Sequence, residues 1–150
     1  MALACDIVIA ADHASFGVPE AKVGLLADAG GLQRLARRVP YVLAMEMLLA
    51  GRILTAAEAV HYGLANAAVP LAELMTRARA TAQAIADAGP LAVQAIKQVV
   101  SESEGMKPAD IFAAVRAGKY PLYAKALMSE DAKEGPQAFA EKRKPIFKGR

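Results

Sequence analysis

A single short β-branched run near the start of the chain constrains the fold more than any other feature. Residues 5–10 read CDIVIA, which predicts a buried strand that includes Cys5. Helical patterns dominate the chain after Gly31, so few later segments could pair with this strand. A lone strand leaves its backbone groups unpaired. We therefore expect the partner strands to lie in another chain or in a segment that precedes Met1.

A turn-rich segment, residues 11–31, follows this strand, and we expect the functional site there. Residues 14–17 predict a second short extended piece, and Val18–Pro19 favours extended backbone before a turn. Glu20 comes directly afterwards, either as a functional carboxylate or as an acid that favours a helix N-terminus. Loops held by a scaffold carry many binding and catalytic residues, which is why this segment matters.

Asp28, Gly30 and Gly31 end the turn-rich segment, and their roles stay open on local sequence alone. Asp28 suits either the N-cap of the next helix or a position in a pocket. The two glycines could cradle a phosphate, but two glycines without a wider fingerprint are a weak signal. They also allow a close approach of the backbone to a ligand.

The rest of the chain predicts a series of helices bracketed by proline, glycine and capping residues. The capping-box pattern Thr55–Glu58 opens one helix, and Phe139 and Lys142 are expected to share a face of the last one. A brief strand is expected at residues 66–69. The predicted helices cover residues 32–36, 40–50, 55–62, 70–88, 90–100, 108–128 and 130–144.

Composition narrows the class of protein. The chain has 150 residues, 55% of them hydrophobic, which is enough to bury a core. A single cysteine excludes an internal disulfide and favours a reducing cytoplasm; we expect Cys5 to be buried. No apolar run approaches the roughly 18 residues of a membrane span, so no membrane role is expected. His13 and His61 are isolated in the sequence, so no metal site is expected.

The last ten residues are basic, with five basic side chains and one acidic one. Such a tail attracts phosphates or acidic partners, although a frayed, solvated terminus fits the charge equally well. No aromatic stacking platform accompanies it, so a nucleic-acid partner is not expected.

Six stretches along the chain form a recognisable set of motifs. They are ACDIVIAA at 4–11, ASFGVPEAKVG at 14–24, DAGGLQRL at 28–35, AMEMLLAGR at 44–52, AEAVHYGL at 57–64 and FAEKRK at 139–144. Together, in this order and over essentially the whole chain, they resemble the enoyl-CoA hydratase/isomerase (crotonase) superfamily. The stretch at 129–139 and the FKGR ending are also similar to the carnitinyl-CoA dehydratases within it.

The resemblance implies an α/β fold of the ClpP/crotonase-like type, of which this chain matches only the C-terminal part. Residues 1–31 would be a remnant of the strands and the active-site loop. Residues 32–150 would be a mainly helical region that contacts coenzyme A and forms a trimer. Met1 would be an interior methionine of a longer protein. The oxyanion hole and a second catalytic carboxylate would then lie upstream, so we expect little hydratase activity from the isolated chain.

The resemblance also implies roles for individual residues. Glu20 would be the acid/base carboxylate in reversible hydration or dehydration of a 2-enoyl-CoA. The terminal helix would reach the coenzyme A of a neighbouring subunit, where Phe139 would pack by the adenine and Lys142 would meet a phosphate. Arg143 and Lys144 could serve the same role as Lys142. The acyl pocket would include Pro19, Leu25, Asp28 and Gly30.

Two alternative functions stay open. Glu20 and Asp28 could instead form the carboxylate pair of an enoyl- or dienoyl-CoA isomerase. The chain could also be an inactive fragment that binds coenzyme A or assembles with a paralogue.

The resemblance also implies the cofactor, assembly and location of the protein. Coenzyme A would enter only as part of the acyl-CoA substrate, with no other cofactor. A cytoplasmic homotrimer or hexamer in fatty acid metabolism is expected.

Overall fold

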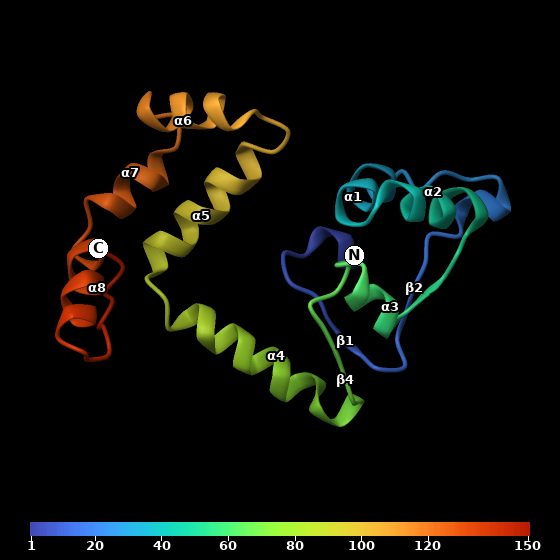
Figure 1. The fold of residues 1–150 in the computed structure, drawn as a ribbon, viewed down its shortest axis with the longest axis horizontal. Coiled ribbons are helices and arrows are strands. Elements are labelled where there is room, and N and C mark those ends of the chain that lie inside the picture. The colour runs from blue at the N-terminus through green and yellow to red at the C-terminus, as the bar shows by residue number, and fades with distance from the viewer. The chain divides into compact units, whose positions relative to one another are not determined.

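The computed structural model describes residues 1–150, which divide into two compact units, Met1–Ala80 and Thr81–Arg150. Figure 1 shows the elements of each unit in chain order. The boundary between the units falls within the long helix α4 (Leu71–Ala86). Each unit has its own buried side chains, so each is described by itself.

The first strand does find a partner within the chain, so the expectation that its partners lie elsewhere was wrong. β1 (Ile9–Ala11) pairs in parallel with β4 (Ala67–Val69), with Ile9 opposite Ala67. Asn66 extends the pairing, because its side-chain oxygen accepts the Val8 N–H at 2.8 Å and its own N–H donates to the Val8 carbonyl at 2.7 Å. The brief strand predicted at 66–69 is the segment that supplies this partner.

The segment before β1 also departs from the prediction. Residues Ala2–Ala4 form a short 3-10 turn, η1, and the strand begins only at Ile9. Cys5 therefore lies outside the strand and is exposed, not buried. The extended piece expected at 14–17 is confirmed as β2 (Ser15–Phe16), which pairs antiparallel with β3 (Leu54–Thr55).

Three helices lie wholly within the first unit: α1 (Gly31–Arg38), α2 (Tyr41–Ala50) and α3 (Ala56–His61). The predicted capping box is confirmed, since the Thr55 side chain accepts the Glu58 N–H and the Glu58 carboxylate accepts the Thr55 N–H. Arg52 bridges Glu46 and Glu58 at 2.7 and 2.9 Å, which ties the end of α2 to the start of α3. The core beneath them comprises Leu35, Val39, Leu43, Ala44, Met47, Leu54, Ala59, Leu64 and Ala65.

The second unit is helical, with α5 (Pro90–Glu102), α6 (Pro108–Arg116), α7 (Pro121–Leu127) and α8 (Asp131–Ala140). The single helix predicted over 108–128 is in fact two helices. Gly118, in a left-handed conformation (φ 73°), and Pro121 at the start of α7 separate them. The break leaves Tyr120 between the two helices, and its side chain is 1% exposed.

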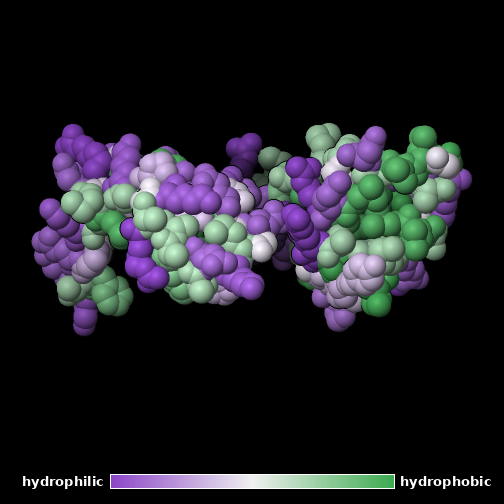
Figure 2. Space-filling model, turned by 90° about the horizontal axis from the view of Figure 1, so that it is seen from above, coloured by the Kyte–Doolittle hydropathy of each residue, from purple (hydrophilic) through white to green (hydrophobic).

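Large apolar side chains remain on the surface of the first unit. Figure 2 shows hydrophobic residues gathered over the part of the molecule that carries α1 and α2. The exposed apolar residues there include Val23, Leu25, Leu26, Tyr41, Val42 and Leu49. No helix in the chain has the length and apolar character needed to cross a bilayer.

Candidate functional site

Glu20 opens a short 3-10 turn, η2 (Glu20–Val23), which Pro19 precedes and Gly24 ends. Gly24 has a φ of 74°, a left-handed conformation that glycine adopts without steric penalty. The Glu20 carbonyl accepts the Leu25 N–H at 3.0 Å, so the turn fixes the backbone on both sides of the carboxylate. The chain therefore places Glu20 on a constrained turn rather than on a regular helix.

The Glu20 carboxylate is half-buried, and its Oε2 atom is buried without any hydrogen-bond partner. A buried polar atom left unsatisfied is destabilising, so such groups in folded proteins call for an explanation such as catalysis or a bound water. Among buried side-chain nitrogen and oxygen atoms, Glu20 Oε2 is the one atom in the chain with this property.

Glu20 lines two cavities. One, of about 160 Å³, has room for a few water molecules and otherwise presents backbone, apolar side chains and Arg34. The other, of about 290 Å³, is almost entirely apolar. Residues lining the smaller cavity are Met1, Leu3, Gly17, Val18, Glu20, Ala27, Ala29, Gly30, Gly31 and Arg34. Those lining the larger one are Val18, Glu20, Ala21, Leu25, Leu26, Ala27, Leu32, Ala36, Met45, Leu48 and Leu49.

The two glycines at the start of α1 shape the smaller cavity. Gly30 has a φ of 91°, and a Cβ atom there would lie 2.7 Å from Nη1 of Arg34. A Cβ on Gly31 would lie 2.7 Å from Cβ of Ala27. Both positions therefore need glycine, one for its backbone conformation and one for the close approach of the Ala27 turn.

The other residues expected around the acyl pocket do not all gather at Glu20. Gly30 lines the smaller cavity and Leu25 the larger one. Pro19 is exposed and lines neither. Asp28 is also exposed and outside both cavities, and α1 has no side-chain cap, so Asp28 does not cap that helix.

Phe139 and Lys142 do not share a helix face, contrary to the prediction, because α8 ends at Ala140. The Lys142 N–H donates to the Phe139 carbonyl at 3.2 Å, and the Arg143 N–H donates to the Ala138 carbonyl at 3.0 Å. This pair of bonds is the Schellman ending of a helix, which normally has glycine at the position that Lys142 occupies. Phe139 is 87% exposed, and Lys142 is exposed as well.

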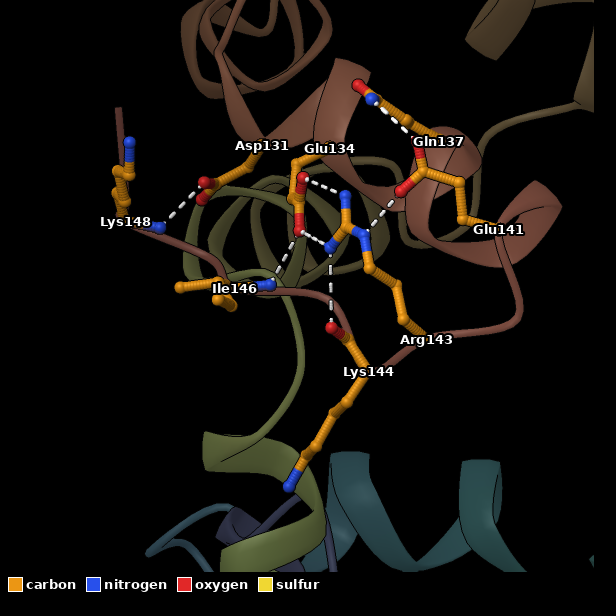
Figure 3. Close-up of polar contacts among 8 residues, drawn as sticks. All are labelled: Asp131, Glu134, Gln137, Glu141, Arg143, Lys144, Ile146 and Lys148. Atoms are coloured by element: carbon orange, nitrogen blue, oxygen red, sulfur yellow. Dashed lines mark hydrogen bonds and ion pairs between the residues drawn. The ribbon is translucent and has the colours of Figure 1, made fainter.

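The basic C-terminal segment is folded back along α8 rather than frayed (Figure 3). Asp131, which is 7% exposed, accepts the N–H groups of Lys148 at 2.7 Å and Gly149 at 2.8 Å. Glu134 accepts the Ile146 N–H at 2.8 Å. Two acids of α8 thus hold the segment through its backbone.

Arg143 adds a side-chain anchor for the same segment (Figure 3). Its Nη1 and Nη2 atoms donate to the two carboxylate oxygens of Glu134 at 2.6 and 2.9 Å, and its Nε donates to Glu141. The bond from Arg143, with that from the Ile146 N–H, lowers the pKa of Glu134 from its ordinary 4.5 to about 2. Glu134 is therefore charged at neutral pH and fully partnered.

The sequence pattern singled out neither Asp131 nor Glu134, and it offered Arg143 only as another phosphate contact. They occur in a run of alternating charges at the end of the chain, which looks like a solvated helix and tail. Only the return of the chain along α8 brings residues 9 to 18 positions apart into contact. The structure gathers no group of three or more His, Cys, Asp or Glu side chains suited to a metal ion.

Comparisons with known proteins give a consistent result. A sequence model described as enoyl-CoA hydratase/isomerase matches residues 1–150. A carnitinyl-CoA dehydratase of Proteus mirabilis is 45% identical over the whole chain, and one of Salmonella agona is 43% identical. Both alignments cover 58% of the relative, so the chain spans less than two thirds of the curated relatives it matches.

Solved structures agree with these sequence relatives. An enoyl-CoA hydratase from Mycobacterium tuberculosis matches with a TM-score of 0.88 and 42% identity, over 99% of this chain and 57% of its own. An enoyl-CoA hydratase from Bacillus anthracis matches with a TM-score of 0.90 and 36% identity, over 99% of this chain and 56% of its own. The likeness therefore covers the sequence as well as the fold.

Proposed function

Because this chain belongs to the enoyl-CoA hydratase/isomerase family, we propose that it supplies part of a site that adds water to, or removes it from, a 2-enoyl-CoA thioester. The crotonase fold of the family accounts for the arrangement of α1 to α3 and the short strands. The observation that carries the proposal is the buried, unpartnered Oε2 atom of Glu20 at the wall of two cavities. The relatives of similar sequence are named as hydratases and dehydratases.

In this proposal Glu20 acts as the general acid and base. Its free carboxylate oxygen holds a water molecule in the smaller cavity and takes a proton from it as the water oxygen bonds to Cβ and the electron pair of the double bond moves onto the thioester. The same carboxyl group then gives that proton to Cα. In the reverse direction the carboxylate takes the Cα proton and gives it to the departing hydroxyl, which leaves as water. The mechanism suits a carboxylate because a positioned side chain that transfers a proton accelerates such steps by about 10²–10⁴-fold.

The acyl group would occupy the larger cavity, whose walls are almost wholly apolar. Leu25, Leu26 and Met45 line it and would exclude water from the chain beyond the reacting carbons. An enolate-like intermediate also needs N–H donors at the thioester oxygen. In this proposal those donors come from the part of the family fold that these residues do not span.

The second unit would recognise the coenzyme A that is bound by a neighbouring subunit. We assign the phosphate contact to Lys142 and the adenine contact to Phe139, both of which are exposed at the end of α8. A lysine ammonium suits a phosphate as a point charge. The isomerase alternative has less support, because Asp28 is exposed and does not line either cavity beside Glu20.

The test is a matched pair of substitutions, Glu20→Gln and Asp28→Asn, in the protein at the length found in its own cells. We expect Glu20→Gln to lower kcat for hydration of crotonyl-CoA about 10²–10⁴-fold, and Asp28→Asn to change it by less than about threefold. Equal losses in both variants would favour the isomerase alternative, which double-bond migration assays would then measure directly. Full turnover by Glu20→Gln would overturn the proposal.

The intact mass of the native protein should be measured first. The 150 residues alone have a mass of 15.7 kDa. If the native protein has that mass and does not turn over crotonyl-CoA, the role as an inactive chain that binds coenzyme A or a paralogue replaces the enzymatic one.

A further inference from the structure

Lys142 has a backbone conformation that is unusual for its residue type. Its φ is 54°, and it is the one non-glycine residue in the chain with a positive φ. Residues with a Cβ atom disfavour this region because the Cβ approaches the following carbonyl oxygen. Glycine would avoid the clash, and the six other helix or turn positions with positive φ that precede Lys142 are all glycine. The chain therefore keeps a lysine side chain where glycine would fit better.

Lys142 also differs from the other basic residues of the C-terminal segment. Arg143 pairs with Glu134 and Glu141, and Lys144 lies 3.7 Å from Asp87. Lys148 and Arg150 both lie within 3.6 Å of the Glu130 carboxylate. Lys142 is the one basic side chain of residues 141–150 with no carboxylate within ion-pair distance. Its ammonium is therefore available to an anion from outside.

The residues on both sides of Lys142 are fixed by a single guanidinium (Figure 3). Arg143 holds Glu134 with two parallel bonds and Glu141 with a third, so Glu141 and Arg143 are tied to each other and to α8. Bidentate pairing of this kind fixes geometry as well as charge. Strained backbone persists only where its surroundings over-determine it, and here the Arg143 bonds and the helix-ending bonds do so.

We propose that Glu134 and Arg143 are positioning residues that hold Lys142 in its left-handed conformation, so that its ammonium meets a phosphate of coenzyme A. The inference rests on the proposed function, which assigns that phosphate contact to Lys142. Glu134 acts through Arg143 and does not itself touch the ligand. The strained backbone of Lys142 links the pairing of Arg143 with Glu134 to ligand binding.

The experiment measures dissociation constants for coenzyme A and for pantetheine, which lacks the nucleotide and its phosphates, by isothermal titration. Lys142→Ala should weaken coenzyme A binding about fivefold, as expected for an exposed ion pair, and leave pantetheine binding unchanged. Glu134→Gln should weaken coenzyme A binding about threefold, again without effect on pantetheine. Glu130→Gln is the matched control, because Glu130 pairs with the same segment but not with residues 141–144.

The two proposals fail in different ways. Unchanged coenzyme A binding by Lys142→Ala would overturn the assigned phosphate contact, and the inference with it. Weakened binding by Lys142→Ala together with unaltered binding by Glu134→Gln would overturn the positioning role alone. A loss by Glu134→Gln that is equal for pantetheine would also overturn it, since the effect would then be structural.

A backbone measurement supplies an independent readout that needs no ligand. The three-bond coupling between the amide and α protons of Lys142 reports its φ. Glu134→Gln should move that coupling away from its value in the wild-type protein, because Lys142 would leave the left-handed region. If this variant does not fold, Arg143→Lys keeps the charge but removes the bidentate pairing, and it should also move the coupling away from the wild-type value. An unchanged coupling in the folded variant would contradict the proposal.

Discussion

Two acidic sites, one in each unit of the molecule, use their carboxylates in opposite ways. In the first unit, Glu20 has a buried carboxylate oxygen with no partner, at the wall of two cavities. In the second, Asp131 and Glu134 accept bonds from three backbone N–H groups and from Arg143. The contrast separates two uses of a carboxylate. One with its lone pairs occupied holds the chain, and one with a free oxygen in a cavity is available for proton transfer.

The largest expected effect is on turnover and should fall on Glu20 alone. We expect Glu20→Gln to lower kcat about 10²–10⁴-fold while the melting temperature stays the same or rises, because no folded-state bond is lost. Glu134→Gln should show the reverse, with kcat nearly unchanged, KM raised about threefold through weaker coenzyme A binding, and a lower melting temperature. Steady-state kinetics and circular dichroism of the two variants provide the comparison. A lower melting temperature for Glu20→Gln would remove the distinction between the two acids.

Removal of the Asp131 carboxylate should be the largest effect on stability. Asp131→Asn presents an amide N–H₂ to one of two backbone N–H donors, and we expect a loss of about 2 kcal/mol in the free energy of unfolding. Urea unfolding followed by circular dichroism measures this loss. Faster hydrogen exchange at Lys148 and Gly149 would locate it. Glu130→Gln, on an exposed carboxylate, should change stability by much less.

Relief of the strained backbone should produce a smaller change of opposite sign. Lys142→Gly should raise the free energy of unfolding by about 1 kcal/mol, since glycine adopts positive φ without the Cβ clash. The same variant should bind coenzyme A more weakly because the ammonium is lost. Lys144→Gly is the control, as Lys144 does not have a positive φ and should gain no stability. A stability loss in Lys142→Gly would show that the lysine side chain contributes packing.

The pH dependence of the C-terminal segment should give the smallest effect. The pKa of Glu134 is lowered from 4.5 to about 2, so its contribution to stability is complete above about pH 4.5 and is lost as the pH falls toward 2. Hydrogen exchange at the Ile146 amide between pH 5 and 2, corrected for the intrinsic rate, follows this loss. Glu134→Gln should remove the pH dependence from that amide. Persistence of the same dependence in the variant would assign it to another acid.

Local signals in the sequence located most helices of the chain. The capping box at Thr55 and Glu58 predicted the start of α3, and Gly51 marked the end of α2. These signals work because they satisfy backbone groups within a few residues. The single helix predicted over 108–128 was wrong for a local reason too. Gly118 and Pro121 interrupt the helical pattern, and both residues are visible in the sequence.

The candidate site was predicted in part. Glu20 and Gly30 line the smaller cavity, and Leu25 lines the larger one. Pro19 and Asp28 face outward, and no pattern in the turn-rich segment distinguishes an inward carboxylate from an outward one. The roles of these residues, the phosphate contact of Lys142, the oligomeric assembly and the cytoplasmic location stay predictions.

The sequence by itself determined the family, the approximate positions of most helices and the acid that carries the proposed chemistry. Those features depend on residue types at short spacing, which a linear pattern records. Only the tertiary structure decided that β1 pairs with β4 and that the basic segment packs along α8. The tertiary structure also decided that Lys142 adopts a strained, left-handed backbone conformation at the end of α8. These outcomes depend on contacts between distant residues, whose geometry no local propensity specifies.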